Sequence, residues 1–151
     1  VSFGSLEQMV AATFDAVSPI EQLSVTEAAE KYVYIRQPGA YVGYWTPRPA
    51  PYIVEPQEMM DSLSHTGVIF VGPARSLKSQ MALNWIAKIA KTDPSDFMCV
   101  HMAQHTARDW SKRELDKVFR DSTEAKGGGP GLQQLLLPGS QNDNTFDKRF
   151  L

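Results

Sequence analysis

The predicted fold depends on one stretch of the chain, VIFVGPARSLKS, which spans Val68–Ser79. Its first four residues are all apolar, as is typical of a short strand buried on both faces of a sheet. Gly72 and Pro73 interrupt the apolar run and indicate a loop. Apolar residues then recur at helical spacing, at Ala82, Trp85, Ile86 and Ile89. The stretch therefore predicts a strand, a tight loop and an amphipathic helix, in that order.

A second strand and a second helix are predicted further along the chain. Phe97–Met102 is another apolar run, and Thr106–Asp109 has the spacing of a capping box at a helix N-terminus. In the helix that follows, Leu115, Val118 and Phe119 form an apolar stripe. The order strand, loop, helix, strand, helix predicts an α/β fold with a parallel sheet, right-handed crossovers and flanking helices.

The loop between the first strand and its helix matches most of a phosphate-binding motif. Gly72, Lys78 and Ser79 occupy fixed positions of the pattern G-x-x-x-x-G-K-[ST]. In such a loop, main-chain amides and the helix N-terminus attract phosphate oxygens. The lysine reaches the β- and γ-phosphates and the serine hydroxyl holds Mg²⁺. The sequence thus predicts an incomplete P-loop NTPase fold that binds ATP and Mg²⁺ through Gly72, Ala74, Ser76, Lys78 and Ser79.

Two residues of this loop leave alternatives open. Leu77 stands where the motif has its second glycine, and its side chain is poorly tolerated if that position needs a positive φ. In the alternative interpretation, Gly72 and Pro73 form an ordinary turn and Lys78 is an ordinary first-turn residue. Arg75 is the candidate catalytic residue: it steadies charge at the γ-phosphate, bridges to a neighbouring subunit, or is simply solvated.

The residues before the first strand divide into two parts. Ser24–Glu27 has capping-box spacing and predicts a helix. Five prolines between Gln37 and Pro56 favour an irregular connector, followed by a short helix over Glu55–Leu63. A helix over 6–17 and a strand over 145–151 are predicted near the two ends. The predicted parts are an N-terminal helical segment at 1–36, a proline- and aromatic-rich connector with a short helix at 37–64, and the first part of a P-loop ATPase domain at 65–151.

Composition restricts the class of protein. The chain has 151 residues, 42% hydrophobic and 21% charged, which suits a globular domain and excludes a disordered segment. No 18-residue apolar run predicts a membrane span, and the single cysteine, Cys99, excludes an internal disulfide, so we expect a cytoplasmic protein. Residues 1–64 hold eight acidic and three basic side chains, whereas residues 65–151 hold nine and twelve. A polyanion is therefore expected to meet the second part of the chain.

Several segments carry a resemblance to a known family when they are taken in order. They are LSVTEAAEKY at 23–32, GYWT at 43–46, PY at 51–52, MDSL at 60–63, ARSLKS at 74–79, LNWI at 83–86 and DNTFDKRF at 143–150. Their succession resembles the amino-terminal part of lambda-type (GpA-type) large terminase subunits of tailed phages. The resemblance runs from about Leu23 to the last residue.

This resemblance implies a P-loop ATPase with additional strands, in a family whose phosphate loops are often irregular. It implies that Lys78 and Ser79 contact phosphate and Mg²⁺ and that Arg75 is the loop arginine. Tyr52 and Gln57 are the nearest matches to the segment that commonly holds adenine. The resemblance also implies that the acidic strand and a metal-dependent nuclease lie beyond the last residue, so the chain by itself is expected to hydrolyse little ATP.

The predicted function is therefore that of the ATPase portion of a viral DNA-packaging motor, which uses ATP and Mg²⁺ to move double-stranded DNA into a procapsid. The implied partners are DNA, a small terminase subunit, the portal and further copies of the chain, and no membrane. Two alternatives remain at this point. One is another P-loop enzyme, such as a helicase-like ATPase or a kinase, and the other is a non-catalytic protein-binding module with a vestigial phosphate loop.

Overall fold

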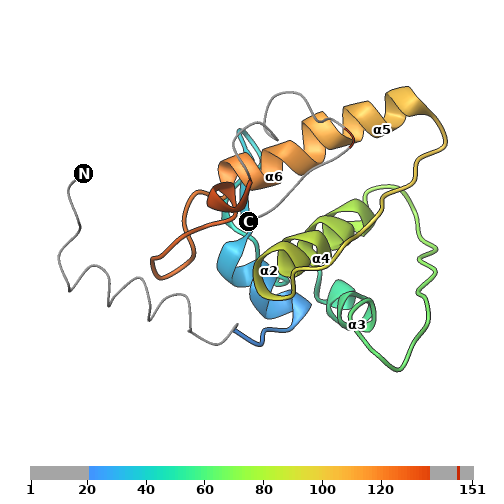
Figure 1. The fold of residues 1–151 in the computed structure, drawn as a ribbon, viewed down its shortest axis with the longest axis horizontal. Coiled ribbons are helices and arrows are strands. Elements are labelled where there is room, and N and C mark those ends of the chain that lie inside the picture. Colours follow the sequence, from blue (N-terminus) through green and yellow to red (C-terminus); the bar gives the residue numbers. More distant parts are fainter. Residues whose placement is uncertain (1–20, 137–145, 147–151) are drawn as a thin grey trace, which may run out of the picture.

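The computed structural model describes residues 21–136 and Phe146. Helices dominate this part of the chain, and its strands form a two-stranded antiparallel sheet. In Figure 1, α2, α3 and α4 gather together and the run from α5 to α6 crosses beside them. The elements are α2 (Val25–Tyr32), β1 (Tyr34–Gln37), β2 (Tyr41–Tyr44), the 3₁₀ turn η1 (Pro51–Ile53), α3 (Val54–Met59), α4 (Lys78–Thr92), α5 (Gln104–Trp110), the π-helical turn η2 (Ser111–Leu115), α6 (Asp116–Asp121) and the 3₁₀ turn η3 (Gln133–Leu135).

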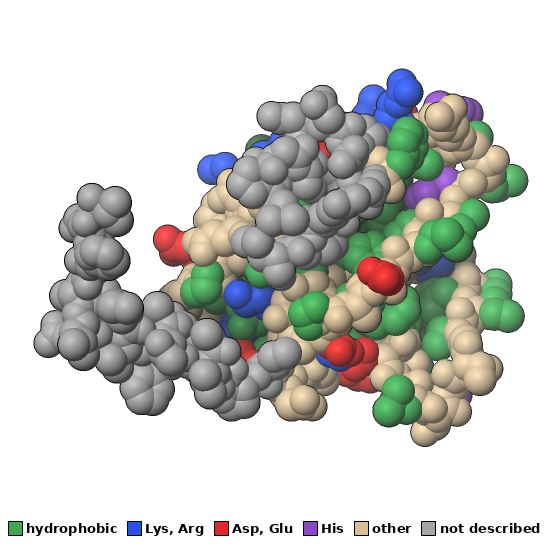
Figure 2. Space-filling model, in the orientation of Figure 1, with side chains coloured by type: hydrophobic (Ala, Val, Ile, Leu, Met, Phe, Trp, Pro, Cys, Tyr) green, Lys and Arg blue, Asp and Glu red, His purple; other side chains and the backbone are tan. Residues whose placement is uncertain are grey.

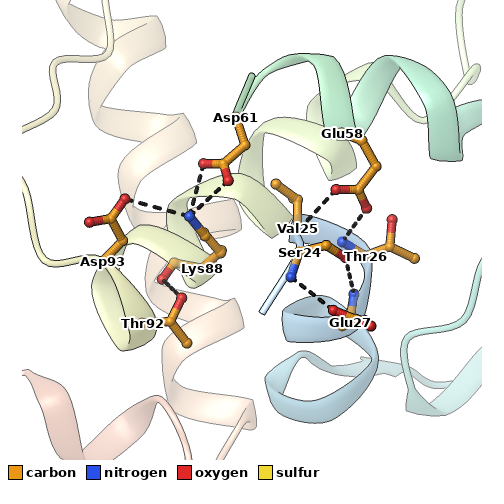
Figure 3. A network of polar contacts seen from close by, with 9 residues as sticks. All are labelled: Ser24, Val25, Thr26, Glu27, Glu58, Asp61, Lys88, Thr92 and Asp93. Carbon is orange, nitrogen blue, oxygen red and sulfur yellow. Dashed lines mark hydrogen bonds and ion pairs between the residues drawn. The ribbon is translucent and has the colours of Figure 1, made fainter. Parts of the chain in front are cut away.

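Helix α2 begins as its capping box predicts. The Ser24 hydroxyl accepts from the Glu27 N–H at 3.3 Å, and the Glu27 carboxylate accepts from the Ser24 N–H at 2.9 Å. A second carboxylate arrives from α3, because Glu58 accepts from the N–H groups of Val25 and Thr26 at 3.2 and 2.9 Å (Figure 3). The unpaired donors of the first helical turn are thus satisfied by local and distant acceptors together.

The connector is more regular than the sequence predicts. Strand β1 pairs with β2 around a turn at Pro38–Ala40, in which Gly39 has a φ of 85°. Glycine takes this left-handed conformation without steric cost, and the flanking tyrosines and valine suit strands. Trp45 follows β2 and is 3% exposed, so it anchors the connector onto the core. The prediction of an irregular segment over 37–56 is therefore wrong for the hairpin.

One hydrophobic core joins the elements from α2 to η3. Helix α4 contributes its buried face, and Phe119 of α6 is 1% exposed. The short helix predicted over 55–63 is confirmed in part by α3, which lies against α2 and α4. The core residues include Ala29, Val33, Trp45, Ile53, Met81, Ile86, Phe119 and Leu132.

The parallel sheet expected from the sequence is not formed by the described residues. Val68–Val71 and Phe97–Met102 have no regular secondary structure and pair with no strand in this part of the chain. A strand needs a neighbour about 4.8 Å away to bond its main-chain groups, and neither segment has such a neighbour among the described residues. Most of their side chains are exposed, Ile69 to 92% and Met98 to 85%, whereas Phe70 and Phe97 are partly buried against the core. Figure 2 shows hydrophobic side chains along the edge where these segments run.

The two predicted helices of the second part of the chain are present. Helix α4 spans the predicted range, and its apolar face is buried. The second helix starts at Gln104 instead of after a cap at Thr106, because Ala103 already accepts the first helical bond, from the Ala107 N–H at 3.0 Å. Leu115 and Phe119 face inward as predicted.

The ends of the chain carry two further predictions, the helix over 6–17 and the strand over 145–151. The helix, and the strand apart from Phe146, lie outside the described residues. Among the helices that the structure describes, none has the length and apolar character to cross a membrane.

Candidate functional site

The loop between residues 72 and 77 has the backbone conformation that a second glycine would provide. Leu77 lies in the left-handed region, with φ 62° and ψ 14°, and serves as the N-cap of α4. Arg75 also has a positive φ, of 63°. A left-handed conformation costs a non-glycine residue about 1–2 kcal/mol. The loop therefore keeps this turn at Leu77 despite the missing glycine, at the expense of local strain.

The Lys78 side chain folds back over this loop. Its amine donates to the carbonyl oxygens of Gly72 at 2.8 Å and Pro73 at 2.5 Å, and to the Ser76 hydroxyl at 3.0 Å. The Ser76 hydroxyl in turn donates to the Pro73 carbonyl at 2.9 Å. A Cβ atom on Gly72 would lie 3.2 Å from the Ser76 hydroxyl oxygen, so this glycine makes room for the folded loop. The amine is thus held at the loop and not released into solvent.

The first turn of α4 offers main-chain donors to an anion. The first N–H groups of a helix have no acceptor within the helix. At α4 no side chain caps them, and the first turn contains no acidic residue. Helix α2 differs, because Ser24 and Glu58 supply oxygen acceptors there. An uncapped helix N-terminus beside a lysine amine fits a phosphate group both in charge and in hydrogen bonding.

The remaining predicted residues of the loop are accessible. Ala74, Arg75 and Ser79 are exposed, and Ser79 lies in the first turn of α4 next to Lys78. The described residues contain no group of three or more histidine, cysteine or acidic side chains that would hold a metal by themselves. A single hydroxyl is nevertheless a fitting ligand for Mg²⁺, which usually keeps several waters and binds through substrate phosphates.

The two residues implied as adenine contacts, Tyr52 and Gln57, differ in their exposure to solvent. Tyr52 lies on η1 with 60% of its surface exposed. Gln57 lies on α3 and is fully buried. Its amide donates to the Thr26 hydroxyl at 3.1 Å and accepts from the Asn84 amide at 2.8 Å. Contact between Gln57 and a base would require these internal bonds to break.

Sequence reasoning missed two amides that lie close to the loop along α4. Asn84 is fully buried and accepts from the Gln80 amide at 2.9 Å, and Gln80 lies two residues after Lys78. The signal was present as polar residues spaced four apart at positions 80, 84 and 88 on a helix with an apolar face. The spacing gives no indication of the residue across from Asn84, because Gln57 is 27 positions away.

The helical run from α5 to α6 carries basic side chains on its outside. Arg108, Arg113 and Arg120 are exposed. Two basic residues of this run form ion pairs, Lys112 with Asp116 at 3.8 Å and Arg120 with Asp121 at 3.6 Å. These pairs reduce the net positive charge that the run presents to a polyanion.

The fold and the loop define a mixed helix and strand protein with a lysine-bearing turn at the start of its longest described helix. A family model for the ATPase domain of the phage terminase large subunit gpA matches residues 39–150. The chain belongs to this family, which confirms the resemblance of its sequence to GpA-type terminases. No curated protein and no solved structure matches the chain.

Proposed function

We propose that the chain is the nucleotide-binding part of a viral DNA-packaging motor and that residues 72–79 bind ATP with Mg²⁺. The observation that carries this proposal is the folded loop, where the Lys78 amine and the uncapped first turn of α4 lie together. The family of the chain, a terminase ATPase domain, supports the same site. Loop strain at Leu77 and Arg75 is typical of ligand-binding turns.

Each residue has a distinct role in the proposed site. Main-chain amides at the start of α4 orient the phosphates, and the Lys78 amine exchanges its carbonyl acceptors for phosphate oxygens. The Ser79 hydroxyl is the protein ligand of Mg²⁺, and Arg75 steadies charge on the terminal phosphate. ATP supplies the phosphoanhydride bond whose cleavage provides the free energy for movement. Tyr52, exposed on η1, remains the candidate for stacking on adenine.

The same proposal accounts for the exposed apolar segments. We infer that Val68–Val71 and Phe97–Met102 are strands of the parallel sheet of a P-loop NTPase fold, with their partner strands outside the described residues. Ile69, Val71, Met98 and Val100 are each more than three quarters exposed, which is unusual for apolar side chains of a soluble domain. Strands that are apolar on both faces belong inside a covered sheet.

The proposed partners are double-stranded DNA, a small terminase subunit, the portal of a procapsid and further copies of the chain. DNA would meet the outer face of the run from α5 to α6, where Arg108 and Arg113 are exposed. Phosphate contacts of this kind are sequence-independent and weaken with salt.

Titration with MgATP tests the nucleotide site. We expect the Lys78→Ala variant to bind MgATP more weakly than the unchanged chain by about 1.5–3 kcal/mol, because it loses a charge-assisted bond. Lys112→Ala is the matched control, since it removes one positive charge from η2, which is not part of the loop at 72–79. Equal MgATP affinity in the unchanged chain and the Lys78→Ala variant would contradict the proposal and favour a binding module with a vestigial loop.

A further inference from the structure

A chain of side-chain hydrogen bonds links α2, α3 and the first turn of α4. The Gln57 amide donates to the Thr26 hydroxyl at 3.1 Å, and its carbonyl oxygen accepts from the Asn84 amide at 2.8 Å. The Asn84 carbonyl oxygen accepts from the Gln80 amide at 2.9 Å. We call these four residues the amide relay. Its two central members, Gln57 and Asn84, have no exposed surface.

The relay holds the helices in one relative position. A buried amide that loses its partner costs about 1–3 kcal/mol, so these bonds resist any shift that separates the two side chains. Helices α2, α3 and α4 also lie in contact with one another, and Figure 1 shows them gathered together. Because the Gln57 bond to Asn84 is directional, it constrains how far α4 rotates or slides along its axis relative to α3.

The relay ends beside the strained part of the loop. Gln80 belongs to the first turn of α4, whose N-cap is Leu77 in the left-handed conformation. A strained backbone persists only where the surrounding structure holds it in place. The first turn of α4 follows this strain directly. The relay connects that turn, through Asn84 of the same helix, to Gln57 of α3 and Thr26 of α2.

We propose that Gln57 and Asn84 are positioning residues for the phosphate-binding loop, and that through them the placement of α2 and α3 sets the nucleotide affinity. This inference rests on the proposed nucleotide site. It also gives Gln57 a role other than adenine contact, since both ends of its amide are used within the relay. The two residues act through Gln80 and the first turn of α4 and not by touching the nucleotide.

The test compares two relay variants of the 151-residue chain with a matched control. Gln57→Met with Asn84→Leu replaces both buried amides by apolar groups of similar size, which can be nearly neutral for stability. Gln80→Ala removes only the partly exposed end of the relay and so leaves the core intact. Lys88→Met is the control, because Lys88 also bonds α4 to the chain after α3, through Asp61, but lies one turn further from the loop.

Three quantities are measured for each variant: hydrogen exchange of the Met81 amide, the affinity for MgATP, and the midpoint of urea unfolding. The Met81 N–H donates to the Leu77 carbonyl at 3.0 Å and so reports on the first bond of α4. We expect both relay variants to exchange faster at Met81 and to bind MgATP about 3- to 10-fold more weakly. We expect Lys88→Met to lower the unfolding midpoint while leaving exchange at Met81 and MgATP affinity within about twofold.

The outcomes separate this inference from the proposed function. Unchanged exchange at Met81 in the relay variants overturns the inference whether or not nucleotide binds. The inference is also overturned if MgATP affinity falls in proportion to the unfolding midpoint in the relay variants and in Lys88→Met alike. A contact that only stabilises the fold would behave in this way. If the unchanged chain binds no MgATP, the proposed function fails, and hydrogen exchange then decides alone whether the relay positions the loop.

Discussion

The Lys78 amine lies 2.8 Å from the carbonyl oxygen of Gly72, six residues earlier, and so closes the loop over the start of α4. Carbonyl oxygens are neutral acceptors, whereas phosphate oxygens are anionic and therefore bind the lysine ammonium more strongly. The amine is therefore held near the main-chain donors of α4 by bonds that an anion can replace. The loop has Leu77 in place of the second glycine of the motif. It nevertheless keeps a lysine amine beside the main-chain donors of a helix start, as in a loop that matches the whole motif.

Replacing Leu77 by glycine is expected to stabilise the chain. The left-handed conformation of Leu77 costs about 1–2 kcal/mol, and glycine avoids this cost but loses about 0.5–1 kcal/mol of chain entropy. We expect a net gain of about 0.5–1 kcal/mol in the free energy of unfolding, measured in urea. Leu77→Ala is the control, because it keeps the Cβ atom and the strain. An equal gain in both variants would show that the side chain, and not the backbone, is responsible.

Removing Glu58 is expected to weaken the start of α2. Its carboxylate accepts from the N–H groups of Val25 and Thr26, so Glu58→Ala leaves two donors of the first turn without this acceptor. We expect a loss of about 1–2 kcal/mol in the free energy of unfolding, as for the loss of a helix cap. Glu55→Ala removes an exposed acid from the same helix, α3, and should change stability by less than about 0.5 kcal/mol. Equal losses in the two variants would contradict the capping role.

The ion pair between Lys88 and Asp61 is expected to respond unequally to the removal of its two members. Lys88 is buried and bonds to both oxygens of Asp61, at 3.0 and 2.8 Å (Figure 3). Asp61→Ala leaves this lysine with only a 3.5 Å contact to the exposed Asp93, and we expect a loss of about 2–3 kcal/mol. Lys88→Met fills the same space with apolar atoms and should cost less. Thermal unfolding of both variants checks this order, and a larger loss for Lys88→Met would reverse the interpretation.

The contacts of Glu21 predict a dependence of stability on pH. The hydrogen bond from Lys31, with a further one from the Tyr32 hydroxyl, lowers the pKa of Glu21 below its ordinary value of 4.5. A lowered carboxyl pKa contributes stability that is present above about pH 4.5 and is lost as the pH falls further. Because both side chains of the ion pair are about one third to one half exposed, the contribution is at most about 1 kcal/mol.

Urea unfolding from neutral pH down to about pH 3 measures this contribution. The Glu21→Gln variant should be less stable than the unchanged chain at neutral pH, and the difference should shrink as the solution is acidified. The same bond raises the pKa of Lys31 above 10.5, so the difference should also shrink in strong alkali, as Lys31 loses its proton. A difference that stays constant over the whole range would show that the ion pair contributes nothing that titrates.

Much of the helical structure was predictable because its signals are local. Ser24 and Glu27 lie three residues apart, and that spacing alone places the start of α2. The apolar period of α4 and the inward residues Leu115 and Phe119 are likewise properties of one helix face. The start of α5 was predicted three residues too late. A capping box at Thr106 indicates only a preference, and the Ala107 N–H already bonds to the carbonyl oxygen of Ala103, which is the N-cap.

The strands were predicted less well for a physical reason. An apolar run such as Val68–Val71 shows that a segment can be a strand, but strand formation depends on a neighbour that the run does not specify. In the hairpin, β1 finds its neighbour after a three-residue turn, so pairing is local and occurs among the described residues. The segment 97–102 has no such turn and pairs with no strand among the described residues.

By itself, the sequence determined the position of the lysine-bearing loop, the helices that carry local caps and apolar faces, and the terminase family of the chain. Tertiary structure alone decided that Leu77 adopts a left-handed conformation, that Glu58 caps α2 and that Gln57 bonds to Asn84. Local spacing encodes interactions within one helical turn, because there the backbone sets the geometry. Partners 27 to 33 residues apart meet only when whole helices pack, and their meeting depends on how the core fills.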